Sequence, residues 1–278
     1  RCLVDNGIGC VEEVSYLLTR GIDTIVIDHH TPGEPLPPTY ATIHYLTCGY
    51  GDVPVSAGYL SFLFSVLLLG RVDPYLLTLG AISTISDLMP IKSHNRVIVA
   101  LALDYIARYG YREIKLLSDT EHVDETTLSM VVIPAINAIG RICEDHKVSR
   151  CVHYFADLDG DKVRLANWML EVNKQRKNAT NEALGIIKPE DNVAGIVVIG
   201  HLKVGLNGLL ANRLLSTYGK PSAVFSPSNG DEDCYIGSMR APQGVDLTLF
   251  QRENADILLR FGGHPGAGGV TIRKAETQ

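Results

Sequence analysis

The chain has 278 residues, of which 46% are hydrophobic and 20% are charged, a composition typical of a soluble globular protein of about two domains. The formal net charge of −6 argues against a surface coated with cations for non-specific nucleic-acid binding, although it allows a local cationic groove. The longest apolar stretch, Tyr59 to Leu69, is shorter than the roughly 20 residues of a membrane span, so no membrane association is expected. The six cysteines show no C-x-x-C pairing and indicate neither a zinc site nor a disulfide framework, which suits a cytoplasmic protein.

Short β-branched runs alternate with helical patterns at the start of the chain. Residues 1–7 predict a strand and an Asn-Gly turn, residues 11–20 an amphipathic helix, and a second strand runs up to Asp28. A proline-rich loop follows over 31–38. This alternation predicts βαβ units and a parallel sheet, in which functional side chains gather at the carboxyl ends of the strands. Asp5 and Asp28 stand at such ends.

Helices dominate the middle of the chain. Core helices are predicted over 55–70 and 74–85, and Asp87 follows the second of them just before a proline. The stretch 161–187 has helical periodicity with no Gly or Pro before Gly185, which predicts one long helix. A new α/β pattern then begins, with strands at "VAGIVVIG", "PSAVFS", "CYIGSMR" and "GGVTI" and helices over 205–218 and 247–259.

The order of these elements predicts an α/β protein with two domains. A parallel-sheet domain is expected over residues 1–160, joined by a connecting helix over 161–188 to a smaller α/β domain over 189–278.

Asp28 is followed directly by two histidines. Adjacent side chains within a strand point to opposite faces, but at a strand end, where the backbone turns, His29 and His30 can face the same crevice. A lone Asp, such as Asp5 or Asp87, is more often a cap or a turn former than a ligand. Taken together, however, carboxylates with an imidazole suit Mn²⁺ or Mg²⁺. Two such ions about 4 Å apart activate a water and stabilise a leaving oxygen, so the residues favour hydrolysis of a phosphate ester.

The second domain contains residue types that bind anions. "GSMRAP" places Ser238 and Arg240 at a turn, and arginine recognises phosphate through two parallel hydrogen bonds. Residues 261–269, "FGGHPGAGG", have five glycines in nine residues around His264. We interpret this segment as a loop whose backbone amides can approach a phosphate, the alternative being an ordinary turn.

Two further segments have both a functional and a structural interpretation. "NAIGR", residues 137–141, is either a third anion-binding element or a helix end capped by Gly140. The cations at Lys174, Arg176 and Lys177 either line a nucleic-acid path or solvate an exposed helix face.

These motifs occur in the order seen in the DHH phosphoesterase superfamily, and most closely resemble its RecJ-type single-strand exonucleases. The resemblance runs from Leu3 to Ile272. It implies a DHH domain and a DHH-associated domain that face each other across a cleft, with two Mn²⁺ or Mg²⁺ ions on the first. The segments that carry it are "LVDNGI", "VIDHHTPGEPLP", "GAISTISDLMPIKSHNR", "IPAINAIGR", "VNKQRK", "GLNGLLANRL", "GSMR" and "LLRFGGHPGAGGVTI".

The resemblance also implies roles for single residues of the DHH domain. Asp5 matches the carboxylate that bridges the two ions, and His29 and Asp87 match ligands of one ion. Asp28 matches the partner that orients a histidine. His30 matches the residue that contacts the scissile phosphate or protonates the leaving group.

For the DHH-associated domain, the resemblance implies a substrate-binding role. Ser238 and Arg240 match a pocket for the terminal 5′ phosphate, and Arg141 matches an arginine along the DNA path. His264 matches the histidine of the Gly-Gly-His motif near the substrate backbone, together with Gly262 and Gly263.

The implied activity is metal-dependent removal of nucleotides from the 5′ end of single-stranded DNA, with replication or repair proteins as candidate partners. Two alternatives stay open: a DHH-type oligoribonuclease or 3′-phosphoadenosine-phosphate phosphatase, and a catalytically silent replication scaffold. An Asp-x-Asp motif is expected upstream of Arg1, and an OB-fold after the Gly-Gly-His strand; the upstream sequence would discriminate the nuclease from the scaffold.

Overall fold

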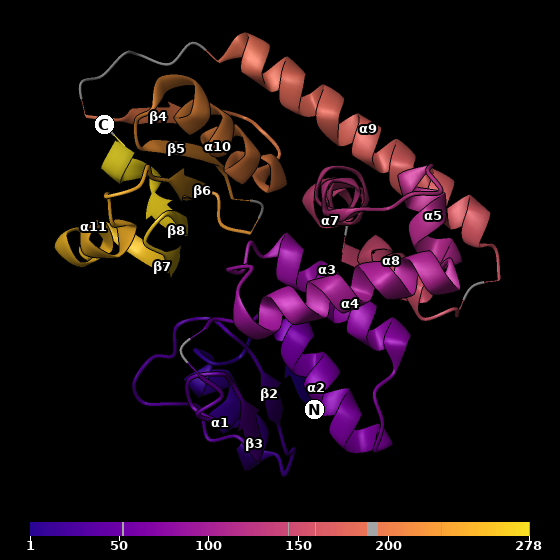
Figure 1. Cartoon of the computed structure of the whole chain (residues 1–278). Helices are drawn as coiled ribbons and strands as arrows, with labels where there is room; N and C mark the ends of the chain where they lie inside the picture. The colour runs from indigo at the N-terminus through magenta and orange to yellow at the C-terminus, as the bar shows by residue number, and fades with distance from the viewer. Residues whose placement is uncertain (52, 144, 159, 188–193, 229, 278) are drawn as a thin grey trace. The chain divides into compact units, whose positions relative to one another are not determined.

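The computed structural model describes residues 1–51, 53–143, 145–158, 160–187, 194–228 and 230–277. The chain forms two compact units, Arg1–Pro134 and Ala135–Gln278 (Figure 1). Each unit combines helices with one sheet, which confirms the predicted α/β class. The assignment of residues 189–278 to a separate substrate-binding domain stays a prediction. In the described part of the chain, no helix is both long and apolar enough to cross a bilayer.

The first unit is built on a three-stranded parallel sheet with the strand order β1-β2-β3. The strands β1 (Cys2–Val4) and β2 (Ile25–Ile27) are joined by helix α1 (Val11–Thr19), as predicted. The third strand, β3 (Ala41–Ile43), was not predicted and follows the proline-rich loop. Because all three strands run in the same direction, their carboxyl ends meet at one edge of the sheet.

Local capping sets the ends of the helices that follow. Helix α2 (Ala57–Leu69) begins where the Ser56 hydroxyl accepts a backbone N–H of the first turn, and it ends at Gly70 in the left-handed conformation. Helix α3 (Pro74–Ser86) begins with Asp73 as its N-cap. The remaining helical elements of this unit are α4 (Ser93–Tyr109), α5 (Arg112–Ser118), the short α6 (Glu125–Thr127) and one π-helical turn (Leu128–Val132).

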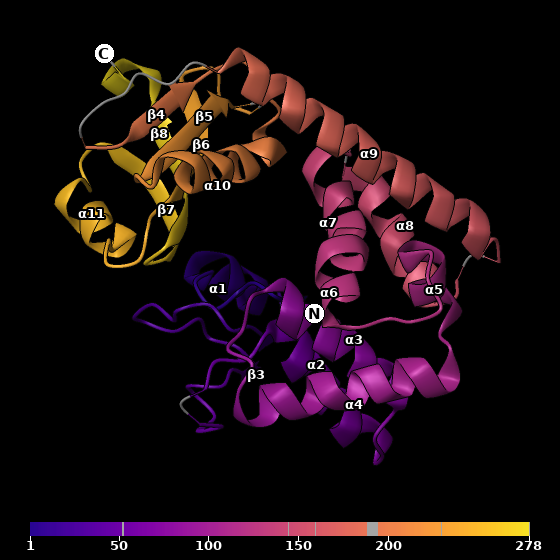
Figure 2. The same cartoon turned by 45° about the horizontal axis from the view of Figure 1, so that its top comes forward.

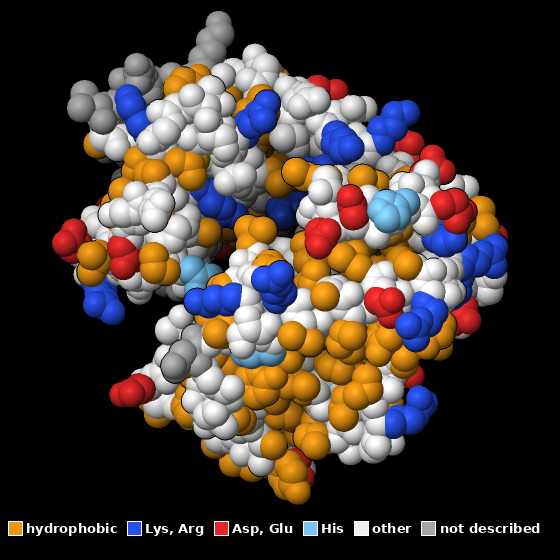
Figure 3. Space-filling model, in the orientation of Figure 1, with side chains coloured by type: hydrophobic (Ala, Val, Ile, Leu, Met, Phe, Trp, Pro, Cys, Tyr) orange, Lys and Arg blue, Asp and Glu red, His pale blue; other side chains and the backbone are white. Residues whose placement is uncertain are grey.

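The core of the first unit lies where α2, α3 and α4 pack against β2. Ile27, Tyr59 and Leu77 are among its buried members. A Cβ at Gly58 would lie 2.4 Å from the Ser83 Cβ, so only glycine lets α2 approach α3 this closely. The outer faces of α2 and α4 remain hydrophobic and exposed (Figure 3).

The second unit begins within helix α7 (Ile133–Ile142), which is followed by α8 (Asp145–Phe155). Gly140 lies inside α7, so its interpretation as a helix cap is wrong. The predicted long helix is confirmed as α9 (Lys162–Ile186), and the Asp161 carboxylate caps its first turn.

A five-stranded mixed sheet completes the second unit, with the strand order β4-β5-β6-β8-β7. Only β4 and β5 are parallel; the other neighbours are antiparallel. Helix α10 covers one face of this sheet (Figure 2). The elements are β4 (Ile196–Ile199), a 3₁₀ turn (Val204–Leu206), α10 (Asn207–Tyr218), β5 (Ser222–Pro227), β6 (Cys234–Arg240), α11 (Leu247–Glu253), β7 (Leu258–His264), β8 (Ala267–Arg273) and a 3₁₀ turn (Lys274–Thr277).

Two predictions for the end of the chain are wrong. The helix expected over 247–259 ends at Glu253, and β7 begins at Leu258. The glycine-rich segment 261–269 is a β-hairpin and not a loop. Two of its glycines allow close packing within the hairpin: a Cβ at Gly263 would lie 2.3 Å from the Ala267 carbonyl oxygen, and one at Gly268 would lie 2.7 Å from the Phe261 ring.

Candidate metal centre

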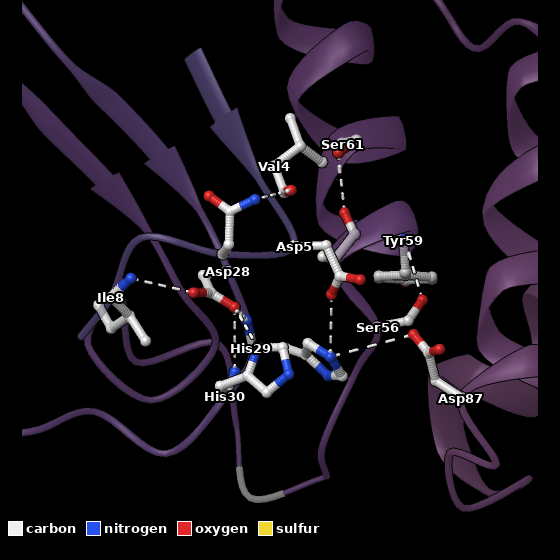
Figure 4. Close-up of polar contacts among 12 residues, drawn as sticks. Val4, Asp5, Ile8, Asp28, His29, His30, Ser56, Tyr59, Ser61 and Asp87 are labelled. Atoms are coloured by element: carbon white, nitrogen blue, oxygen red, sulfur yellow. Dashed lines mark hydrogen bonds and ion pairs between the residues drawn. The ribbon is translucent and has the colours of Figure 1, made fainter. Parts of the chain in front are cut away.

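Asp5 is the first residue after β1 and points across the end of the sheet toward His29 (Figure 4). Its backbone has φ 61°, in the left-handed region that aspartate tolerates better than most residues. Its N–H donates to the Ile27 carbonyl at 2.9 Å, which continues the pairing of β1 with β2. The carboxylate Oδ1 lies 3.2 Å from His29 Nε2. The turn at the strand end therefore aims the carboxylate at the imidazole.

A second carboxylate near His29 comes from the end of helix α3. Asp87 forms the C-cap of that helix, where its N–H donates to the Ser83 carbonyl at 2.9 Å. Its Oδ2 lies 4.0 Å from His29 Nε2, and the histidine is 9% exposed. Burial raises the pKa of Asp87, and the charge of Asp5 raises it further. One nearly buried imidazole nitrogen is thus flanked by two carboxylates from different elements.

Asp28 has a different task from Asp5 and Asp87. It is 1% exposed, and its oxygens accept hydrogen bonds from the backbone N–H groups of Ile8 at 3.0 Å, His29 at 2.7 Å and His30 at 3.2 Å. The same carboxylate lies 2.7 Å from His30 Nδ1. Burial alone would raise the pKa of Asp28, but these hydrogen bonds, led by the one from His30, hold it well below its usual range. Asp28 is therefore a buried anion that fixes the turn and the His30 ring.

The two histidines face the same place, as predicted for a strand end. Their ring centroids are 4.7 Å apart. Asp5, His29 and His30 each offer one ligand atom, and these atoms lie within 4.8 Å of one another. The hydrogen bond with Asp28 raises the pKa of His30, against the opposing effect of partial burial. His30, predicted to act on the substrate, therefore also lies within reach of an ion.

His44 is a polar residue of this site that sequence reasoning missed. It is fully buried directly after β3, and its Nε2 lies 2.8 Å from the His30 carbonyl oxygen. Its Nδ1 accepts the N–H of Leu46 at 3.2 Å. The ring thereby supports the backbone of the His-His turn. Recognition of β3 would have placed His44 at the carboxyl edge of the sheet.

The donor set fits a hard divalent cation. Neighbouring ligands of an octahedral ion with bonds of about 2.1 Å lie about 3 Å apart, and opposite ligands lie about 4.2 Å apart. The separations from His29 Nε2 to Asp5 (3.2 Å) and to Asp87 (4.0 Å) both lie within the span between ligand atoms of one such ion, so these residues would hold it. Carboxylate oxygens with imidazole nitrogen suit Mn²⁺ or Mg²⁺.

The second unit gathers arginines from three distant segments. Arg141 comes from α7, Arg176 from α9 and Arg240 from β6. Burial lowers the pKa of Arg141, and the charges of Arg176 and Arg240 lower it further. Across the described segments, none of these three arginines forms an ion pair with a carboxylate, whereas Arg176 Nε donates to Asn173 Oδ1 and Arg240 Nη1 to the Met239 carbonyl. Neighbouring cations of this kind create a positive electrostatic potential, which favours the binding of an anion.

Ser238 and Arg240 lie on one face of β6, beside the start of α10. A Cβ at Gly208 would lie 2.9 Å from Arg240 Nη2 and 3.5 Å from Ser238 Oγ. The N-terminal amides of α10 therefore lie next to the Ser238–Arg240 pair, where they favour an anion. Asn207, which sequence reasoning missed although it stands in "GLNGLL", is 1% exposed and anchors this helix start through the Ile236 carbonyl and the Ser226 hydroxyl.

The β7–β8 hairpin brings His264 into line with Arg240. Ala267 pairs with both residues, so Arg240, Ala267 and His264 form one row across three neighbouring strands. The Cα atoms of Arg240 and His264 are therefore about 10 Å apart along the row, which is twice the usual spacing between neighbouring strands. In the same way Ser238 and Gly262 flank Gly269, while Gly263 pairs with Gly268.

Comparisons with known proteins agree with these motifs. Residues 2–69 match the family model "DHH family, N-terminal domain". The RecJ single-stranded-DNA-specific exonuclease of Bacillus subtilis (strain 168) is 32% identical over 97% of the chain and 36% of its own length. The RecJ of Thermus thermophilus is 29% identical over 98% of the chain and 41% of its own length. The RecJ of Escherichia coli (strain K12) is 26% identical over 98% of the chain and 53% of its own length. The chain thus spans between about a third and a half of these relatives.

Solved structures show the same relation. A crystal structure of RecJ in complex with Mn²⁺ from Thermus thermophilus matches this structure with a TM-score of 0.85 and a sequence identity of 26%. The match covers 99% of this chain and 42% of the RecJ chain. A crystal structure of exonuclease RecJ bound to manganese, 24% identical with a TM-score of 0.76, shares the fold. The chain therefore matches the model of the DHH family N-terminal domain over residues 2–69 and is similar along nearly its whole length to RecJ single-stranded-DNA-specific exonucleases.

Proposed function

We propose that this protein is a metal-dependent phosphodiesterase that removes nucleotides from the 5′ end of single-stranded DNA. The observation that carries the proposal is the convergence of Asp5 and Asp87 on His29 at the carboxyl edge of a parallel sheet. The relatives that the chain resembles are named as exonucleases specific for single-stranded DNA, and solved RecJ structures contain Mn²⁺ or Mg²⁺. A catalytically silent scaffold would not need this set of ligands.

The residues of the first unit divide into ion holders and positioning groups. Asp5, His29 and Asp87 would hold Mn²⁺ or Mg²⁺, and Asp5 would be shared between two ions. When bound, such ions lower the pKa of a coordinated water and stabilise the charge of a leaving oxygen. Asp28 holds the His30 ring by its Nδ1, so that His30 can present Nε2 to the scissile phosphate and protonate the leaving group there.

The residues of the second unit would select the end of the strand. Ser238, Arg240 and the first amides of α10 offer several donors to the extra charge of a terminal 5′ phosphate. Arg141 would contact a backbone phosphate, and His264 and its two preceding glycines would lie along the strand. Residues 189–278 would thus act as the substrate-binding domain, with α9 as its connection.

Binding of Mn²⁺ tests the centre directly, without a substrate. In a titration followed by electron paramagnetic resonance of free Mn²⁺, we expect the protein to bind the ion and His29→Ala to weaken binding by more than about tenfold, since even outer partners of ligands contribute that much. The matched control is His122→Ala, because His122 is exposed and stands in a loop of the same unit. Equal Mn²⁺ affinity of the protein and of His29→Ala would remove His29 from the proposed centre.

A further inference from the structure

A second cationic feature of the second unit lies between helices α9 and α10. Residues of the two helices line an open groove with a volume of about 390 Å³. Lys and Arg side chains lie over these helices on the face seen in Figure 3. The polar residues that line the groove are Arg176, Lys177 and Arg213 as cations and Thr180, Asn181, Asn212 and Ser216 as neutral groups.

The charge in this groove has one sign. No carboxylate is among its described lining residues, whose apolar members are leucines of both helices. Lys177 and Arg213 are exposed, and in the described part of the chain neither forms an ion pair. Three cations without an acidic partner, in a protein whose net charge is −6, are a local concentration of positive potential.

The hydrogen bonds of the lining residues determine which of them can donate to a ligand. The Thr180 hydroxyl donates to the Arg176 carbonyl at 2.8 Å, and the Ser216 hydroxyl donates to the Asn212 carbonyl at 2.9 Å. These hydroxyls are therefore left as acceptors. The cations and the two asparagine amides remain as the donors, which suits a ligand rich in acceptor oxygens, such as a phosphate ester.

Arg176 links the groove to the arginine cluster described above. It lines the groove, and its charge also acts on Arg141. Its Nε donates to Asn173 Oδ1, so its Nη groups are the donors that remain for a ligand. Arg176 therefore belongs both to the groove and to the cluster with Arg141 and Arg240.

We propose that the α9–α10 groove is a second nucleotide-phosphate site, which binds phosphate groups next to the arginine cluster. This inference rests on the proposed function. The phosphate can come from two sources: the backbone of the DNA strand itself or a nucleoside 5′-monophosphate that hydrolysis has released. The groove volume is within the range of small-ligand sites, and both sources present the same anionic oxygens to Lys177 and Arg213.

The test measures binding of thymidine 5′-monophosphate and of a 5′-hydroxyl thymidine oligonucleotide in the presence of a chelator, so that the metal centre does not contribute. Arg213→Ala and Lys177→Ala should each weaken binding of the groove ligand by about tenfold. If the strand is the ligand, the slope of its log affinity against log salt should also fall by about 0.7 for each cation removed. The control is Arg252→Ala, which removes an exposed cation at the end of α11.

The outcomes separate the two sources and the two proposals. Weaker binding of the oligonucleotide assigns the groove to the strand, and weaker binding of the monophosphate alone assigns it to the released nucleotide. The groove site is wrong if neither ligand loses more affinity in these variants than in Arg252→Ala. A failure of the proposed function would appear elsewhere, as absence of metal-dependent hydrolysis by the unmodified protein.

Discussion

Replacement of Asp5 by asparagine should abolish nearly all phosphodiester hydrolysis while the protein stays folded. The substitution keeps the size of the side chain but removes the negative charge that faces His29 Nε2 at 3.2 Å. Loss of an outer partner of a metal ligand costs about 10- to 100-fold in activity, so loss of a ligand shared by two ions should cost more than about 100-fold in kcat. Steady-state hydrolysis of a 5′-phosphorylated single strand with Mn²⁺ measures the effect.

The matched control for Asp5→Asn is Asp104→Asn. Asp104 is an exposed carboxylate of the same unit, and its partner is Arg108 one helical turn away. We expect this variant to retain the kcat of the unmodified protein, because exposed ion pairs contribute little. Hydrolysis by Asp5→Asn at a rate close to that of Asp104→Asn would contradict the assignment of Asp5 as a shared ligand.

Replacement of Arg240 by alanine should selectively impair hydrolysis of 5′-phosphorylated strands. A hydrogen bond to a charged group contributes about 1.5–3 kcal/mol, so kcat/KM on such a strand should fall about 10- to 100-fold. A strand with a 5′ hydroxyl lacks the terminal phosphate, so its kcat/KM should fall far less. The ratio of kcat/KM between the two substrates is the quantity to measure.

Arg273→Ala provides the control for Arg240→Ala. Arg273 is exposed at the opposite end of the same strand pair, where it faces Cys234, whereas Arg240 faces Ala267. Its removal changes the net charge equally but leaves the Ser238–Arg240 pair in place. If Arg240→Ala lowered kcat/KM equally on both substrates, the pocket for the terminal phosphate would have to be assigned elsewhere.

The elements that could be predicted from the sequence are those whose pattern is local. The periodicity of α9 and the Asp-Pro start of α3 specify these helices within a few residues. The strand β3 has only three residues beside a proline-rich loop, which is too short for an alternating pattern. The strand β7 contains Gly262 and Gly263, and glycine is rare in strands. At Gly263 it is required by the close approach of β8, a contact between strands that no local pattern shows.

The candidate site shows the same limit. Asp5 and Asp28 could be placed at the carboxyl edge because each directly follows an apolar run. Their different roles could not be predicted from the sequence. The Asp28 carboxylate is held in the interior by hydrogen bonds from three backbone N–H groups, whereas the left-handed backbone of Asp5 directs its carboxylate outward. The proximity of Arg141 to Arg240 brings together residues of α7 and β6, which are separated by most of the second unit along the chain, and no local pattern shows it.

The most direct test of the central claim is release of nucleotides from a 5′-phosphorylated single strand by the unmodified protein, with Mn²⁺ and with a chelator. The carboxylate–imidazole centre predicts 5′-mononucleotides in the presence of Mn²⁺ and none once the ion is removed. Release that continues unchanged in the chelator, or no release under either condition, would contradict the assignment of this centre to metal-dependent hydrolysis of single-stranded DNA.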